Sequence, residues 1–438
     1  MLTAAVLSLQ FHSSAQTAST SLASQAALVT EMDVNGLKVL VKRRPASGTV
    51  AAALFFRGGT RNSTPANAGL ENFTLSTMTE GSQKFPREAL RREIASTATG
   101  IGGSAGYDYS TLSLVATREF FDRGWDLFTD AALHPAFASA DIELVRQRLV
   151  TSLSNDQDDP DSQLQLLVNQ TVYAKTSYAN DPRGTVENIG KFKVEDLRSY
   201  HQGMMQTSRL LLVIVGDVDP EMIRQRVAAT FGKLPRGAYK DAAAPQLDFS
   251  KATLDVTTRS LPTNYIEGVF TAPALTDPDI YPMRVAVNIL RDRVFEEVRI
   301  KRNLSYAPNA DMGTSAGNIG NIYVTAVDAN QATGLMLKEI ESLKSGNVSD
   351  RDVSGVAGQF LTTYFIGNET NAAQAGELAR YELVGGGWRN SYSSLDKIRA
   401  VTPTDIRRVA QKYMRNIRFV VIGDPAAINR SIFVPANN

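Results

Sequence analysis

Two side chains in the second half of the chain, Arg299 and Tyr306, could stabilise a peptide carbonyl that gains negative charge. An arginine guanidinium offers five N–H donors in a fixed plane, and a tyrosine offers one phenolic O–H. Such donors stabilise a developing oxyanion most strongly in a cavity that holds little water. The spacing of seven residues is close to two helical turns, so both side chains could face one side of a helix over 299–306.

Each of these residues also has an ordinary structural explanation. Arg299 could be a surface arginine that pairs with Glu296 or Glu297, and Tyr306 could be a core aromatic residue with its hydroxyl at the rim. Taken singly, the residue types favour these ordinary roles.

Metal-ligating residues are scarce. The chain has no Cys and three His residues, His12, His134 and His201, no two of which are near each other in sequence. A zinc site built from His alone is therefore not expected. His134 follows a predicted helix and His201 ends another, so both are expected to be structural. The acidic run Asp156–Pro160 is interpreted as a solvated helix cap rather than a metal site.

The elements that must position these residues follow from hydrophobic periodicity. An apolar run over 50–56 predicts a buried strand, which leads through a Gly/Arg/Asn loop into a helix from about Leu70 to Met78. Asn35-Gly36 between two apolar runs predicts a hairpin. A Gly-rich turn is expected over 100–109. Further helices are predicted over 88–98, 118–133, 141–155, 162–173, 194–201 and 404–413, and further strands over 29–34, 37–41, 111–116, 209–216 and 417–423.

One pattern occurs twice. A helix over 194–201 precedes a buried strand that ends in Gly216-Asp217, and a helix over 404–413 precedes one that ends in Gly423-Asp424. Such a recurrence predicts a tandem duplication of one α/β unit. The predicted divisions are a leader and spacer, an N-terminal domain, a linker and a C-terminal domain, over 1–27, 28–234, 235–248 and 249–438.

The loop and helix over 58–82 resemble the corresponding segment of the inverzincin (M16, pitrilysin-like) metallopeptidases, where this helix carries His-x-x-Glu-His. Ala68-Gly69-Leu70, Met78 and Gly81-Ser82 match the frame, but the three chemical positions hold Asn72, Leu75 and Ser76. The family's third ligand, a Glu, corresponds to Ser152. None of these four side chains suits zinc or supplies a general base.

The run Phe295–Tyr306 resembles the family's Arg/Tyr signature, with Asn303 at the usual Gly position. The resemblance implies that Arg299 and Tyr306 bind substrate and steady the oxyanion near zinc. It covers residues 28–430 and implies an α+β (α/β sandwich) fold of two homologous domains, each a mainly antiparallel sheet with helices packed on it, arranged as a clamshell.

The resemblance implies a non-catalytic, substrate-binding subunit of a heterodimeric zinc metalloendopeptidase that degrades unfolded peptides in a closed chamber. No cofactor is expected in this chain, and zinc is expected in a catalytic partner with an intact His-x-x-Glu-His. Two alternatives stay open. The chain could be an inactive structural subunit, as in the respiratory cytochrome bc1 complex, or a homodimeric peptide-binding protein.

Composition sets the outer limits. With 438 residues and 43% hydrophobic residues, the chain can bury two or more cores. A net charge of +1 gives no electrostatic argument for nucleic acid. The apolar run Leu2–Leu9 followed by Ser13-Ser-Ala-Gln16 predicts a signal peptide and a periplasmic or secreted protein, with a cytoplasmic location as the alternative. No other run is long enough to predict a membrane span.

Overall fold

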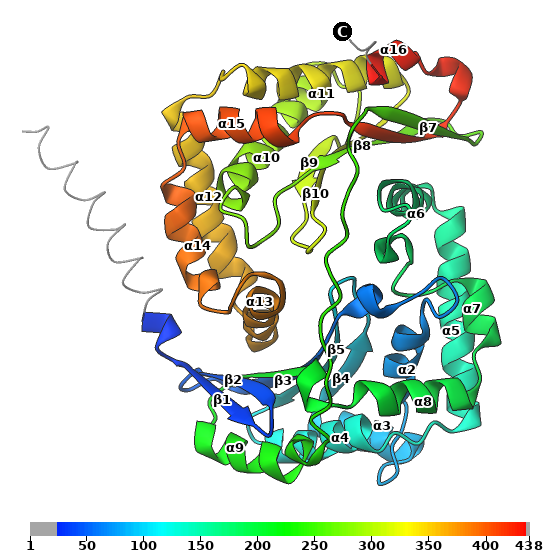
Figure 1. Ribbon diagram of the computed structural model, residues 1–438, viewed down its shortest axis with the longest axis vertical. Coiled ribbons are helices and arrows are strands. Elements are labelled where there is room, and N and C mark those ends of the chain that lie inside the picture. Colours follow the sequence, from blue (N-terminus) through cyan, green and yellow to red (C-terminus); the bar gives the residue numbers. More distant parts are fainter. Residues whose placement is uncertain (1–23, 435–438) are drawn as a thin grey trace, which may run out of the picture.

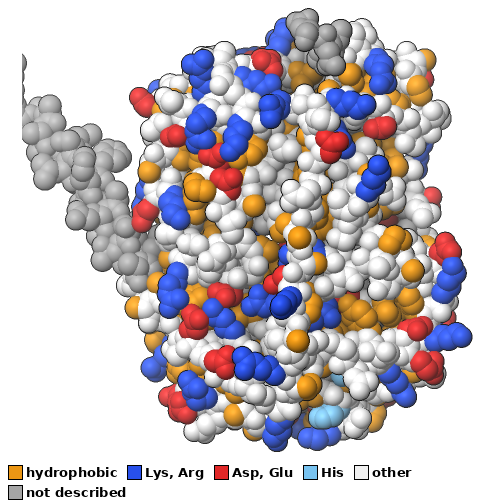
Figure 2. Space-filling view, viewed as in Figure 1, with side chains coloured by type: hydrophobic (Ala, Val, Ile, Leu, Met, Phe, Trp, Pro, Cys, Tyr) orange, Lys and Arg blue, Asp and Glu red, His pale blue; other side chains and the backbone are white. Residues whose placement is uncertain are grey.

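The computed structural model describes residues 24–434, so most of the leader predicted over 1–27 lies outside the described residues. Within that range, the chain has no helix that combines the length and the apolar character needed to cross a membrane. Acidic and basic side chains lie interspersed on the face seen in Figure 2.

Two sheets form the framework of the described chain (Figure 1). The first has the order β1-β2-β6-β3-β5-β4, and the second has the order β7-β11-β8-β10-β9. The strands of the first sheet are β1 (Val29–Val34), β2 (Leu37–Arg43), β3 (Thr49–Arg57), β4 (Gly100–Ser104), β5 (Tyr109–Thr117) and β6 (Leu210–Gly216). Those of the second are β7 (Thr253–Thr258), β8 (Asn264–Thr271), β9 (Asn309–Met312), β10 (Ile319–Ala326) and β11 (Arg418–Gly423).

The second sheet repeats the plan of the first without β1. Strand β6 runs parallel to β2 and antiparallel to β3, and β11 runs parallel to β7 and antiparallel to β8. The preceding helices also start alike, because Asp196 and Asp405 each accept a hydrogen bond from the backbone N–H three residues earlier, at 2.7 and 3.1 Å. The duplication predicted from the two Gly-Asp strand ends is therefore present in the fold.

The hairpin predicted at Asn35-Gly36 is confirmed. Val34 of β1 pairs with Leu37 of β2, and the two turn residues have φ angles of 54° and 81°. Positive φ at both central positions matches the right-handed twist of the flanking strands, and Asn followed by Gly adopts it at low cost.

Each half contributes its own helices, most of which pack on one face of that half's sheet. Those of the first half are α2 (Leu70–Met78), α3 (Arg87–Thr97), α4 (Phe121–Leu133), α5 (Ser139–Asp158), α6 (Pro160–Val172), α7 (Val186–Lys191), α8 (Val194–Met204) and α9 (Pro220–Ala229). Those of the second half are α10 (Ile280–Val294), α11 (Ala329–Lys344), α12 (Asp350–Gly367), α13 (Asn371–Val384), α14 (Asn390–Arg399), α15 (Pro403–Tyr413) and α16 (Arg430–Phe433).

The opposite face of each sheet is covered by helices of the other half. Leu378 of α13 and Tyr392 of α14 pack on Leu40 and other apolar residues of the first sheet. Leu164 of α6 packs with its neighbours on Ile422 and other apolar residues of the second sheet. The two halves thus lie one above the other like the halves of a clamshell, with α6 and α13 between the sheets (Figure 1).

Two expectations are corrected by the structure. The segment 100–109 is not only a turn, because Gly100–Ser104 forms the edge strand β4. Helix α4 begins at Phe121 rather than at 118, and Phe120 is exposed while Phe121, Trp125, Leu127 and Phe128 are buried. Residues 235–248, our proposed linker, carry neither helix nor strand and connect the two sheets.

Candidate functional site

Arg299 and Tyr306 lie just after α10, where the helix changes its geometry. Residues Phe295–Ile300 form a π-helical turn, and the chain then leaves the helix. Asn303 has a φ of 49°, a left-handed conformation that Asn tolerates better than most residues. The helix therefore does not continue to Tyr306, and the condition under which both side chains would face one side of a helix is not met. Asn303 takes the backbone conformation that Gly adopts readily, which brings Tyr306 back toward Arg299.

The two side chains contact each other directly. The Arg299 guanidinium carbon lies 3.8 Å from the centroid of the Tyr306 ring, and an Arg299 N–H donates to the Tyr306 carbonyl. A cation stacked on an aromatic face in this way is held electrostatically. Phe295 contributes a second ring, at 5.6 Å from the guanidinium. Tyr306 is 81% exposed, so the explanation of a core aromatic residue is wrong.

The neighbouring carboxylates do not neutralise Arg299. Glu297 pairs with Lys301 and Arg302, whose hydrogen bonds hold the pKa of Glu297 below its ordinary value. Among the ion pairs of residues 24–434, none involves Arg299. The arrangement therefore presents a cation stacked on an exposed phenol, which can donate hydrogen bonds to a carbonyl oxygen from outside the chain.

The four positions that correspond to the family's zinc ligands and general base lie on two helices in contact. Asn72, Leu75 and Ser76 are on α2, and Ser152 is on α5, which packs against α2. The Asn72 side-chain oxygen accepts a hydrogen bond from the Ala105 N–H at 3.3 Å. Leu75 is fully buried, whereas Ser152 is exposed. Their interpretation as a lost zinc site stays a prediction from the resemblance.

Both described histidines make structural contacts. His134 lies 3.1 Å from the buried Asp130 carboxylate at the end of α4, and His201 contacts the Ala132 carbonyl at 2.8 Å. Burial lowers the pKa of His201. The expectation that these two residues are structural is confirmed by these contacts.

The acidic run over 156–160 behaves as a cap. Asp159 is the N-cap of α6 and accepts a hydrogen bond from the Ser162 N–H at 2.8 Å, and Pro160 occupies the first helical turn. In the part of the chain that the structure describes, no group of three or more His, Cys, Asp and Glu side chains is placed to hold a metal ion.

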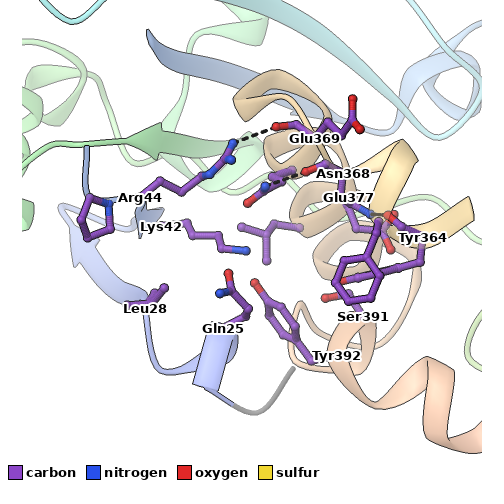
Figure 3. A pocket seen from close by; sticks show the side chains of 14 residues that line it. Gln25, Leu28, Lys42, Arg44, Tyr364, Asn368, Glu369, Glu377, Ser391 and Tyr392 are labelled. Atoms are coloured by element: carbon purple, nitrogen blue, oxygen red, sulfur yellow. Dashed lines mark hydrogen bonds between the residues drawn. The ribbon is translucent and has the colours of Figure 1, made fainter. Parts of the chain in front are cut away.

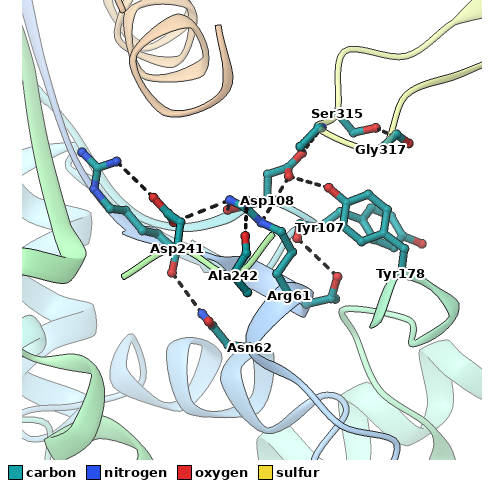
Figure 4. A network of polar contacts seen from close by, with 12 residues as sticks. Arg61, Asn62, Tyr107, Asp108, Tyr178, Asp241, Ala242, Ser315 and Gly317 are labelled. Carbon is teal, nitrogen blue, oxygen red and sulfur yellow. Dashed lines mark hydrogen bonds and ion pairs between the residues drawn. The ribbon is translucent and has the colours of Figure 1, made fainter. Parts of the chain in front are cut away.

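Sequence reasoning did not single out the polar network around Asp108 (Figure 4). Its buried carboxylate lies 3.5 Å from Arg61 Nε, accepts from the Tyr178 hydroxyl, and accepts from the Ala316 N–H at 3.0 Å. Arg61 in turn donates to the Ala242 carbonyl at 3.0 Å. The network joins the loop before α2, the segment between the sheets, and the second half. The sequence indicated this network only through Asp108, a charged residue at the end of a Gly-rich segment.

A second feature that the sequence analysis did not single out is Lys42, the sixth residue of β2. Alternate residues of β2 face opposite sides of the sheet, so Lys42 points to the same side as Leu40, toward the helices of the second half. The sequence indicated this only through the spacing, because Lys42 is two residues after Leu40 in the same strand.

Comparison with known proteins agrees with this architecture. Residues 38–186 match the family model described as Insulinase (Peptidase family M16), and residues 191–360 match the Peptidase M16 inactive domain. The chain is 22% identical to an uncharacterized zinc protease of Streptomyces coelicolor, with 89% of this chain and 88% of the relative aligned. It is also 22% identical to the mitochondrial-processing peptidase subunit beta of Blastocladiella emersonii, with 89% and 87% aligned.

A third relative is described as non-peptidase homolog YmxG of Helicobacter pylori, 22% identical over 65% of this chain and 67% of the relative. Among solved structures, the peptidase M16 inactive domain from Pseudomonas fluorescens superimposes with a TM-score of 0.81 at 18% identity, covering 90% of this chain and 98% of that one. This chain therefore belongs to the M16 peptidase family, and its second half matches that family's inactive domain.

Proposed function

We propose that this chain is the non-catalytic, substrate-binding subunit of a two-chain zinc metallopeptidase that cleaves unfolded peptides. Its partner is an M16 chain with an intact His-x-x-Glu-His, and the chamber lies between the two chains. Arg299 and Tyr306 reach into that chamber and bind the substrate at the partner's zinc site. The alternative of a scaffold subunit, in which the pair has no role, is an outcome of the test below.

One observation carries the proposal. The described chain presents a guanidinium stacked on a phenol that is 81% exposed, while the positions for zinc hold Asn72, Leu75, Ser76 and Ser152. Within this chain the contact holds Arg299 against the turn at Tyr306, but it leaves the Tyr306 side chain exposed. In contact with a partner, the same pair supplies hydrogen bonds to a carbonyl oxygen where charge develops.

The test reconstitutes the complex with each variant and measures cleavage of a quenched fluorescent peptide. Tyr306→Phe should leave assembly intact and lower turnover by about a hundredfold, the usual cost of one oxyanion donor. Arg299→Ala should also raise KM, because it removes anchoring of the substrate backbone. Arg302→Ala is the matched control, since Arg302 lies close to Arg299 in sequence but pairs with Glu297, and should keep the wild-type rate.

Gel filtration of each reconstituted complex separates a loss of assembly from a loss of catalysis. Wild-type rates in both Tyr306→Phe and Arg299→Ala would exclude the substrate-facing role and favour a scaffold. A single species at twice the mass of the chain, with no second polypeptide on purification from the native source, would favour a homodimeric peptide-binding protein.

A further inference from the structure

A cavity of about 400 Å³ lies where the end of β2 meets α12, α13 and α14 (Figure 3). Its wall comes from both halves of the chain, with Gln25, Lys42 and Arg44 on one side and Tyr364, Gln374 and Tyr392 on the other. Its lining residues lie within 25–45 and 364–392, and neither Arg299 nor Tyr306 is among them.

The cavity holds a lysine side chain without a counter-ion. Lys42 is only 5% exposed, and its ammonium lies 5.3 Å from the centroid of the Tyr392 ring. Figure 3 shows this side chain directed into the cavity. Among the described residues, no carboxylate forms an ion pair with it. Arg44 donates to the Glu369 backbone carbonyl at 3.0 Å, and the Glu377 carboxylate pairs with Arg380. The Glu369 side chain also lines the cavity but is exposed, and its carboxylate forms no ion pair with Lys42.

This placement is costly for a cation. Burial, with a smaller contribution from Arg44, lowers the pKa of Lys42 to about 8. A buried charge without a partner is destabilising, and an anion in the cavity would offset that cost. The wall also contains apolar and aromatic side chains, including Leu28, Phe365 and Leu378.

A second polar group in the wall also lacks a partner. The Gln374 amide nitrogen donates to the Asn368 carbonyl at 2.7 Å, but its buried side-chain oxygen accepts no hydrogen bond. Buried acceptors are normally satisfied, so this oxygen is suited to an N–H donor from a ligand.

We propose that this cavity binds the C-terminal residue of a peptide that ends in an apolar or aromatic side chain. The terminal carboxylate pairs with the Lys42 ammonium, the amide N–H of the last residue donates to the Gln374 oxygen, and the side chain packs on Tyr364 and Tyr392. A carboxylate, an N–H and an apolar body are the three features that this wall complements. The substrate class is that of the proposed function, but the site does not depend on a partner's zinc.

The test is calorimetric titration of the full chain alone, so a failure here is distinguishable from a failure of the proposed function. The probes are N-acetyl-Leu-Phe as the free acid, the same compound as its C-terminal amide, and 3-phenylpropionate, which has the carboxylate without the amide. The free acid should bind at least about tenfold more tightly than the amide, as expected for a hydrogen bond to a charged group.

Lys42→Met should weaken binding of the free acid by about tenfold or more and leave thermal stability at or above that of wild type, because it removes a buried charge. Lys338→Met, which removes an exposed lysine on α11, should change neither. Affinity for the acid should fall between pH 7 and pH 9 as Lys42 loses its proton, and this fall should be absent in Lys42→Met.

Equal affinities for acid and amide, or no effect of Lys42→Met, would overturn the proposal. Binding of 3-phenylpropionate as tightly as the peptide acid would also overturn the assignment to a peptide end, because the Gln374 contact would then contribute nothing. A Gln374→Ala variant that binds the peptide acid several-fold more weakly, with unchanged 3-phenylpropionate binding, would support it.

Discussion

The Asp108 carboxylate joins segments that are far apart in the sequence, and its removal should be felt by the whole chain. We expect Asp108→Ala to lower the free energy of unfolding by about 3–5 kcal/mol, because the buried Arg61 guanidinium keeps only the more exposed Asp241 as a counter-ion and the Tyr178 hydroxyl and the Ala316 N–H lose their acceptor. Guanidinium unfolding followed by tryptophan fluorescence measures this. Asp126→Ala, at an exposed position of α4, should change it by less than about 0.5 kcal/mol.

Glu267 should give the stability a pH dependence. It is buried in β8 and accepts from Asn321 Nδ2 at 2.7 Å and from Gln165 of α6, yet burial raises its pKa above the ordinary 4.5. The folded state then keeps a proton that the unfolded chain releases. Relative to Glu267→Gln, wild type should lose stability as pH rises from 4.5 up to the folded pKa, and the difference should be constant below 4.5. A difference independent of pH between 4 and 8 would contradict this.

For Arg299 and Tyr306, the sequence indicated which residues to consider but not how their side chains are arranged. Arg299 and Tyr306 were selected because the run Phe295–Tyr306 resembles the family's Arg/Tyr signature, since their residue types alone favour ordinary structural roles, and their role at a site stays a prediction. Their contact could not be predicted from a helical period, since it depends on the π-helical turn and on the left-handed Asn303 that ends it. Lys42 was missed because its burial is produced by helices more than 300 residues later in the chain.

At the scale of elements, α2 carries the clearest prediction. We expect the purified chain to hold no stoichiometric zinc by elemental analysis, since Asn72, Leu75, Ser76 and Ser152 form no ligand set. A fourfold variant with Asn72→His, Leu75→Glu, Ser76→His and Ser152→Glu would restore one. The Leu75 side chain is fully buried, so a carboxylate in its place should make the zinc-free variant less stable than wild type.

Zinc should raise the melting temperature of that fourfold variant, because a ligand that binds only the folded state stabilises it. The same variant without Ser152→Glu lacks the third zinc ligand, so zinc should raise its melting temperature much less. About one zinc per wild-type chain after dialysis against a weak chelator would refute the prediction.

Hydrophobic patterning predicted most strands and helices of the first half, including β2 and β6, but the strands β7–β10 and the helices α10–α14 of the second half were not predicted. It failed at β4, where Gly100, Gly102 and Gly103 are typical of a turn. A side chain at Gly103 would come within 2.9 Å of the Leu75 carbonyl oxygen, so the close packing of α2 on this strand requires Gly there. Such a tertiary requirement is not visible in a local pattern.

At the scale of the whole molecule, each half places helices on the sheet of the other half: α13 and α14 cover the first sheet, and α6 covers the second. This exchange of helices should prevent either half from being stable alone. A fragment over 24–245 would expose the apolar face of the first sheet that α13 and α14 cover, and a fragment over 246–438 would expose the face that α6 covers. Each fragment should therefore bind a hydrophobic dye and aggregate, and co-expression of both should restore a soluble pair. A monomeric, cooperatively unfolding single fragment would contradict this.

The same exchange of helices sets an order of events during synthesis. The last strand of the first sheet to be made, β6, ends at Gly216, but α13 begins about 150 residues later. At a translation rate of about 5–20 residues per second, the apolar face of the first sheet stays uncovered on the ribosome for about ten to thirty seconds. Lys38, near the start of the chain, meets Glu382 only after nearly all of the chain has been made. During that interval the nascent chain offers a binding surface to chaperones, so its yield in a cell depends on them more than the stability of the finished fold suggests.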